Sequence, residues 1–174
     1  MFAVRHMKPD FTSVAALIAH DETSPMERDN FDDALWLLLC EKVTSPEDLE
    51  AFRPPVGVYF ASRYLEWEVG NGGFAQAAYN IPGWFELAAI GYAALGKPKA
   101  VQLIREAQAL LTNERKVSEN KGLLNGAAIG DVFSHFNESS MAVLDTRIPE
   151  DEWWIDDERV DYVRNNKDAF RQIR

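Results

Sequence analysis

The sequence has little of what a disulfide framework or a metal site would require. Its 174 residues include one cysteine and three histidines. A single cysteine cannot form an internal disulfide, which is typical of proteins from a reducing compartment. Because Cys40 ends the apolar run Leu37-Leu38-Leu39, we expect it to be a small buried residue and not a nucleophile. No two histidines lie one helical turn apart, so no metal site is predicted.

Long apolar runs and an excess of basic residues are missing as well. No stretch reaches the roughly 18 apolar residues that span a bilayer, and no signal-peptide-like stretch follows the first residues. We therefore expect a cytoplasmic protein with no membrane partner. The 18 Lys and Arg residues are outnumbered by 28 Asp and Glu, giving a net charge of −10. This balance argues against direct binding of nucleic acid or anionic lipid.

Strand-like alternation is absent, and apolar residues recur at helical spacing instead. Ser24-Pro25 and Ser45-Pro46 each place a capping serine before a proline, which indicates a helix start. The stripe that follows the first signal consists of Phe31, Leu35, Leu38 and Leu39. We predict an all-α protein, one compact multi-helix domain over residues 1–174. The expected helices cover residues 25–43, 55–69 (closed by Gly70), 74–80, 82–95 (closed by Gly96), 97–111, 132–144 and 156–172, with an irregular loop at about 113–130.

Signatures of catalysis are also lacking. A glycosidase-like pair can be drawn from Glu66, Glu68 or Glu86, yet chance pairs are expected among so many acids. No serine lies in a nucleophile elbow. We predict no enzyme, no catalytic residue and no cofactor.

Acidic residues are what the chain has in excess. Eighteen of the 28 carboxylates lie in residues 21–50 and 145–161, against four basic residues. Such crowding raises self-repulsion, which is tolerated for solubility or for attraction of a positively charged partner. A solvated face is the simpler interpretation, and partner binding is the functional one. The candidate partner-binding residues are Asp29, Asp32, Asp33, Glu47, Asp48, Glu50, Glu150, Asp151, Glu152, Asp156, Asp157, Glu158 and Asp161.

Two tryptophans interrupt the second acidic block. Trp153-Trp154 lies between Glu150-Asp151-Glu152 and Asp156-Asp157-Glu158. The pair is interpreted either as an anchor packed on the core or as an interface hot spot, in which aromatic rings supply affinity and the acids supply steering.

A glycine-rich turn is the sharpest local motif. Glu68, Asn71, Gly72, Gly73 and Gln76 are followed closely by Asn80. Adjacent glycines give the backbone access to positive φ, so the chain can turn tightly there. The polar side chains either lock the turn structurally or form a small pocket for an anion or polar ligand. Neither the Walker spacing nor the dinucleotide glycine spacing is present.

This motif, Glu-x-x-Asn-Gly-Gly-x-x-Gln with an asparagine just after it, resembles the signature of the small acidic bacterial DNA-mimic proteins and their uncharacterised relatives. The similarity extends to residues 82–95 and 159–170. The resemblance implies an all-helical protein, a dimer in its described member, whose acidic surface imitates the DNA phosphate backbone. It also implies capture of a basic DNA-binding regulator of the helix-turn-helix type.

Three functions therefore stay open at this point. The first is an acidic protein-binding module, a DNA mimic that sequesters a transcription regulator. The second is an immunity or antitoxin-like protein that neutralises a basic partner by the same electrostatics. The third is a small-ligand-binding protein that uses the glycine-rich turn.

Overall fold

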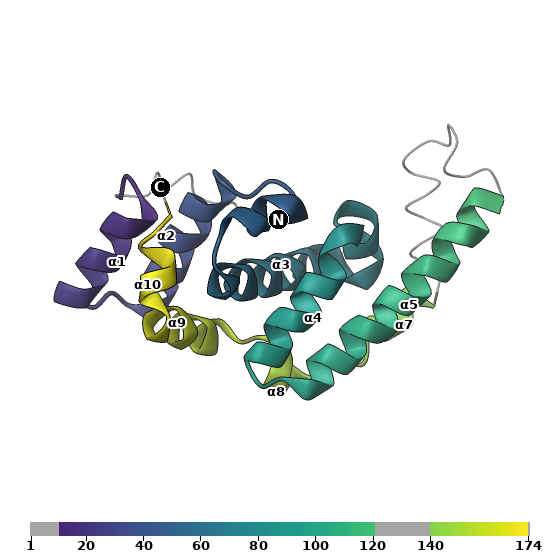
Figure 1. Ribbon diagram of the computed structural model, residues 1–174. Helices are drawn as coiled ribbons and strands as arrows, with labels where there is room; N and C mark the ends of the chain where they lie inside the picture. Colours follow the sequence, from purple (N-terminus) through teal and green to yellow (C-terminus); the bar gives the residue numbers. More distant parts are fainter. Residues whose placement is uncertain (1–10, 121–139, 174) are drawn as a thin grey trace. The chain divides into compact units, whose positions relative to one another are not determined.

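The computed structural model describes residues 11–120 and 140–173, which form helices and no strands (Figure 1). The all-α prediction is confirmed. The chain divides into two compact units, one from Met1–Phe60 with Asp156–Arg174 and one from Ala61–Ile155. A single domain over the whole chain stays a prediction. Within the described ranges, no helix is both long and apolar enough to cross a membrane.

The first unit brings helices from the N-terminal and C-terminal parts of the chain together around one apolar core. It contains α1 (Val14–Thr23), α2 (Arg28–Cys40), η1 (Pro46–Ala51), the first turns of α3 (Pro54–Asn80), α9 (Asp156–Asn165) and α10 (Lys167–Phe170). Helix α2 packs against α1 and α9, and α1 also packs against α10. The fully buried side chains at its centre include Leu17, Phe31, Leu35, Tyr59 and Phe170.

Helix α2 confirms the predicted stripe and corrects the predicted start. Phe31, Leu35, Leu38 and Leu39 are all buried. Ser24, however, ends α1, where its N–H donates to the His20 carbonyl at 2.8 Å, and α2 begins at Arg28 after Glu27. Cys40, expected in the core, is exposed at the last position of α2.

The second start signal is confirmed in a shorter helix. Ser45 and Asp48 form a capping box, in which Asp48 Oδ2 accepts a hydrogen bond of 2.9 Å from the Ser45 N–H. The helix that follows, η1, is a 3-10 helix. The predicted helix 156–172 is divided into α9 and α10 at Asn166, whose side-chain amide donates to the Tyr162 carbonyl at 2.8 Å.

The second unit is built around α3 and a helical hairpin. It contains the rest of α3, η2 (Pro82–Trp84), α4 (Phe85–Ala94), α5 (Pro98–Asn120), α7 (Met141–Asp145) and α8 (Glu150–Trp153). Helices α4 and α5 pack together and are joined by a short turn (Figure 1). The predicted closure at Gly96 is confirmed, since this residue has φ +73°. The buried rings include Phe74, Phe85, Tyr92 and Trp153.

Two predicted boundaries in this unit were wrong. Helix α5 continues to Asn120, so residues 113–120 are helical and not loop; the rest of that predicted loop, and residues 132–139 of the predicted helix 132–144, lie outside the described residues. Gly70 does not close a helix either. Helix α3 runs past it and kinks at Gly72 and Gly73, where the backbone angles are not helical.

Candidate functional site

A group of exposed carboxylates lies on α2 and α9, two packed helices of the first unit, and we call this group the α2–α9 face. Helix α9 begins with Asp156, Asp157 and Glu158, and Asp161 follows one turn later; all four are exposed. Acids in the first turn also suit the positive end of the helix dipole. Helix α2, which packs against α9, adds the exposed Asp29 and Asp33.

Arg28 is the half-exposed cation of this face. Its guanidinium lies 2.8 Å from Asp161 Oδ1 and 3.5 Å from Asp157 Oδ1, and Nη1 donates to the Asp157 carbonyl at 2.7 Å. These carboxylates hold the pKa of Arg28 above its ordinary value, chiefly through the hydrogen bond with Asp161. Arg28 therefore ties α2 to α9, while the carboxylates around it remain in contact with water.

Asp156 also makes a structural contact within the same helix. Its Oδ1 accepts a hydrogen bond from Arg159, which is fully buried. Reversing the charge of Asp156 would therefore disturb a buried guanidinium as well as the surface.

Several of the predicted partner-binding acids are buried or bound within the protein, and one exposed acid, Asp151, is paired with a lysine. Asp32 lies in the interior, 3% exposed, where Oδ1 accepts a hydrogen bond of 2.8 Å from the Tyr59 hydroxyl. Asp48 is used by the capping box of η1. Glu152 accepts from the Lys99 N–H at 2.5 Å at the start of α5, and Asp151 pairs with Lys99 Nζ at 2.7 Å. The remaining exposed acids of the prediction outside the α2–α9 face are Glu47, Glu50 and Glu150.

The glycine-rich motif lies at the α3 kink, and the structure separates the roles of its two central glycines. Gly73 has φ +76°, which other residues rarely adopt, and a Cβ there would overlap the Asp145 carboxylate. Gly72 has extended backbone with φ −167°, so positive φ is not its reason. A Cβ at Gly72 would instead overlap the side chain of Gln76.

Two carboxylates flank the kink. Asp145 Oδ1 accepts the Phe74 N–H at 2.8 Å, and burial raises the pKa of Asp145 despite this bond. Glu68 is 4% exposed and accepts side-chain amide hydrogen bonds from Asn80 at 2.8 Å and Gln76 at 3.3 Å. Asn71 is exposed. The structure thus brings the side chains of the motif residues Glu68, Gln76 and Asn80 together.

An anion is a poor fit for this turn. The Phe74 N–H that would face a bound anion already donates to Asp145, and the nearest charges are carboxylates. Of the two ligand classes left open by the sequence, an anion and a polar ligand, the geometry disfavours the anion.

The two residues of the Trp153-Trp154 pair have different environments, one matching the core-anchor interpretation and the other leaving a ring exposed. Trp153 is fully buried, stacks on Tyr92 at 5.3 Å between ring centroids and accepts a hydrogen bond of 2.9 Å from the Tyr92 hydroxyl at its carbonyl. Trp154 is 51% exposed and lies over Gly70, whose added Cβ would meet the indole at 3.4 Å.

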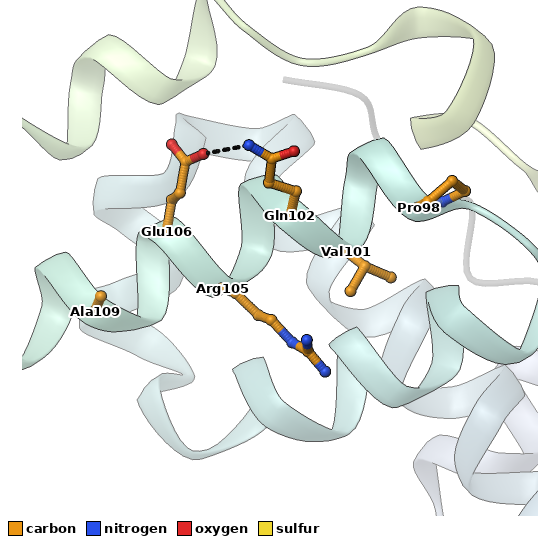
Figure 2. A pocket seen from close by; sticks show the side chains of 6 residues that line it. All are labelled: Pro98, Val101, Gln102, Arg105, Glu106 and Ala109. Carbon is orange, nitrogen blue, oxygen red and sulfur yellow. Dashed lines mark hydrogen bonds between the residues drawn. The ribbon is translucent and has the colours of Figure 1, made fainter.

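Neither of two shallow hollows on the surface is lined by a set of side chains that indicates a bound ligand. The larger, about 510 Å³, follows one side of α5 and is lined by Pro98, Val101, Gln102, Arg105, Glu106 and Ala109. Figure 2 shows Gln102 and Glu106 on one side of α5, joined by a hydrogen bond of 3.0 Å, and Arg105 pointing to the other. The second hollow, about 440 Å³, has its charges paired, Arg164 with Asp21 and Lys167 with Glu22.

The Asp21–Arg164 pair was missed by the sequence analysis. Arg164 Nε and Nη2 donate to the two carboxylate oxygens at 2.9 Å each, and Asp21 Oδ1 also accepts the Met26 N–H at 2.8 Å. Burial alone would raise the pKa of Asp21, but these bonds hold it below its ordinary value. The two residues are 143 positions apart, so no local pattern signals the contact. Across the described ranges, no three His, Cys, Asp or Glu side chains gather as a metal site.

The comparison with protein families finds one match. The family profile described as DMP19-like protein matches residues 50–166, which is more than half of the chain, and the chain therefore belongs to the DMP19-like family. The matched range includes the glycine-rich motif. Neither the curated proteins nor the solved structures contain a match.

Proposed function

We propose that this member of the DMP19-like family is an acidic protein-binding module that captures a basic DNA-binding protein, a transcription regulator, by imitating the charge of DNA. The observation that carries the proposal is the α2–α9 face. Six exposed carboxylates, those of Asp29, Asp33, Asp156, Asp157, Glu158 and Asp161, lie on two packed helices, and two of them, Asp157 and Asp161, bind the half-exposed Arg28.

The electrostatics of such a face fit this role. DNA-binding proteins carry clustered Lys and Arg that gain affinity by replacing counterions along the phosphates. A protein decoy needs the same anionic density on a firm support, and helices packed on a buried core provide that support. The role requires no catalytic residue and no cofactor. Family membership supports it, because the resemblance given by the sequence is to DNA mimics.

The test uses two charge reversals on the face that spare Asp156, Asp157 and Asp161. Asp29→Lys with Glu158→Lys changes the face without removing the Asp156–Arg159 contact or the carboxylates bound by Arg28. The matched control, Glu41→Lys with Glu86→Lys, makes the same change in net charge at exposed positions away from the face. Each protein is immobilised and exposed to native cell lysate at low and high salt.

The expected result is a basic DNA-binding protein that is captured at low salt, released at high salt, and captured poorly by the face variant only. The purified partner should then lose its operator DNA when the wild-type chain is added. Equal capture by the face variant and the control, or a partner that keeps its DNA, would contradict the proposal. A captured toxin without DNA-binding activity would favour the immunity interpretation instead.

A further inference from the structure

The carboxylate of Glu68, at the α3 kink, is a buried charge with only neutral partners. It is 4% exposed, and its hydrogen-bond donors are the amide groups of Asn80 and Gln76. Among the described side chains, no lysine or arginine pairs with it. A carboxylate removed from water normally needs a cation, because the hydration that stabilised its charge has been lost.

One oxygen of this carboxylate is still available. Asn80 and Gln76 both donate to Oε2, at 2.8 and 3.3 Å, and Oε1 accepts no hydrogen bond in the described part of the chain. Glu68 keeps 4% of its surface in contact with solvent. An ionised carboxylate accepts about four hydrogen bonds, and this one uses two.

The groups around Oε1 are acceptors as well. Because a carboxylate only accepts, Asn80 and Gln76 must turn their NH₂ groups toward Glu68; the carbonyl oxygen of Gln76 then lies against Gly72, and that of the exposed Asn80 is left for another donor. Asn71, one helical turn from Glu68 on α3, is exposed and adds a further amide. The cluster therefore joins a carboxylate to neutral amide groups, with the exposed amides of Asn71 and Asn80 near it in sequence or by contact, and this chemistry suits a cation with several N–H donors.

We propose that Glu68, with Asn71, Gln76 and Asn80, forms a binding site for a guanidinium group, supplied by an arginine side chain of the basic partner. The source of the guanidinium rests on the proposed function, whereas its chemistry rests on the site. A guanidinium is favoured over an ammonium because its planar fork can bridge Oε1 and a neighbouring carbonyl, and because it is less strongly hydrated.

The first experiment titrates the protein with N-acetyl-arginine amide and, in parallel, with N-acetyl-citrulline amide, which has nearly the same shape and no charge. The side-chain NH₂ signals of Asn80 and Gln76 are followed by NMR. We expect them to shift with the arginine probe, and the citrulline probe to bind at least about tenfold more weakly. Glu68→Gln should abolish the shift, while Glu86→Gln, an exposed acid on α4, should retain it.

Melting temperature separates this role from a structural one. If Glu68 serves only to hold Asn80 and Gln76, Glu68→Gln lowers the melting temperature. If Glu68 is an uncompensated charge awaiting a cation, the variant melts at the wild-type temperature or higher while arginine binding is lost. Asn71→Lys offers a second variant that leaves Glu68 in place. Its ammonium should compete with the probe and weaken binding by at least about fivefold.

Equal shifts with both probes, no shift at Asn80 and Gln76, or retained arginine binding in Glu68→Gln would overturn the proposal. These failures are distinct from failure of the proposed function. The charge-reversal variants of the α2–α9 face contain none of the four residues of this site. If lysate capture is retained but arginine does not bind, only the proposed guanidinium site is rejected. If arginine binds but salt-sensitive capture is not found, only the proposed DNA-mimic function is rejected.

Discussion

The α2–α9 face and the α3 kink use the same residue types in opposite ways. On α9, Asp157 and Asp161 keep about half or more of their side-chain surface in water and share Arg28. At the kink, Glu68 and Asp145 are drawn inward and bound by amide groups. Exposed carboxylates provide long-range attraction at little cost to the fold, whereas buried ones fix local geometry and are costly to change. The comparison predicts a large difference in stability effects between the two regions.

The largest effect is expected at Gly73. Gly73→Val forces a β-branched residue to φ +76° and drives its Cβ into the Asp145 carboxylate, so we expect a loss of roughly 3 kcal/mol in the free energy of unfolding. Gly96→Val is the matched control, because Gly96 has φ +73° with no atom within 4 Å of an added Cβ. It should lose only about 1–2 kcal/mol, the cost of the backbone angle. Urea unfolding measures both, and equal losses would show that Asp145 does not constrain the kink.

Gly72 tests a different cause. Its backbone is extended, so Gly72→Ala meets only the flexible side chain of Gln76, which can move aside. We expect a loss of about 1 kcal/mol. A loss as large as that of Gly73→Val would mean that Gln76 is held rigidly against the turn.

The second effect separates two acids three residues apart on α2. Asp32→Ala removes the side-chain acceptor of the buried Tyr59 hydroxyl, leaving the weaker bond of 3.1 Å to the Asp32 backbone carbonyl, and should lower the free energy of unfolding by about 1–3 kcal/mol. Asp29→Ala, at an exposed position, should stay within about 0.5 kcal/mol of wild type. Denaturant titration of the two variants checks the difference, and similar losses at both positions would contradict the division between buried and exposed acids.

Asp32 also shows a limit of prediction from the sequence, because its burial was not predicted. The apolar stripe of α2 was correctly predicted because Phe31, Leu35, Leu38 and Leu39 repeat at the helical period, a property of the local chain. Helical periodicity places Asp32 at the edge of this stripe, closer to it than Asp29 and Asp33, but does not tell whether a side chain at the edge is buried. Its burial depends on Tyr59, 27 residues later, just as the low pKa of Asp21 depends on Arg164 at a separation of 143. Contacts between distant residues decide which acids remain on the surface.

The tryptophan pair and the glycine-rich motif show the same limit. Sequence offered an anchor or a hot spot for Trp153-Trp154 as one unit, and the structure buries the first ring and exposes half of the second. The motif indicated a tight turn, but not that Asp145 from α7 would occupy the Phe74 amide. That contact comes from a helix more than 60 residues away in sequence, and it is what disfavours an anion at the turn.

The third effect concerns how stability changes with pH. We expect opposite directions of change for substitutions at Asp21 and Asp145. The pKa of Asp21 is lowered in the folded state, so its stabilisation is full above the unfolded pKa, about 3.9, and is lost as pH falls through the folded value. Asp21→Asn should therefore cost about 1–3 kcal/mol at pH 7 and less near pH 3.

Asp145 should behave in the opposite way. Burial raises its folded pKa, so ionisation disfavours the folded state as pH rises from about 4 through that value. Asp145→Asn keeps an acceptor for the Phe74 N–H and removes the charge, so its stability relative to wild type should improve between pH 3 and pH 7. Unfolding curves at the two pH values decide both cases. Parallel pH profiles for Asp21→Asn and Asp145→Asn would contradict the opposite environments assigned to them.

The smallest effect on the fold, and the sharpest test of the comparison, is at Arg28. Arg28→Gln removes the half-exposed cation of the α2–α9 face and leaves Asp157 and Asp161 in water, so the melting temperature should change little. If the face binds a basic partner, the same change should strengthen capture at low salt, by about two- to fivefold, because the face becomes more negative and two carboxylates are released. Raising the salt should remove most of the gain.

Lys42→Gln, a change of equal charge near the end of α2 remote from Arg28, should leave capture nearly unchanged. Weaker capture by Arg28→Gln would mean that a partner recognises the ordered Arg28 network, and that carboxylate density alone does not explain binding.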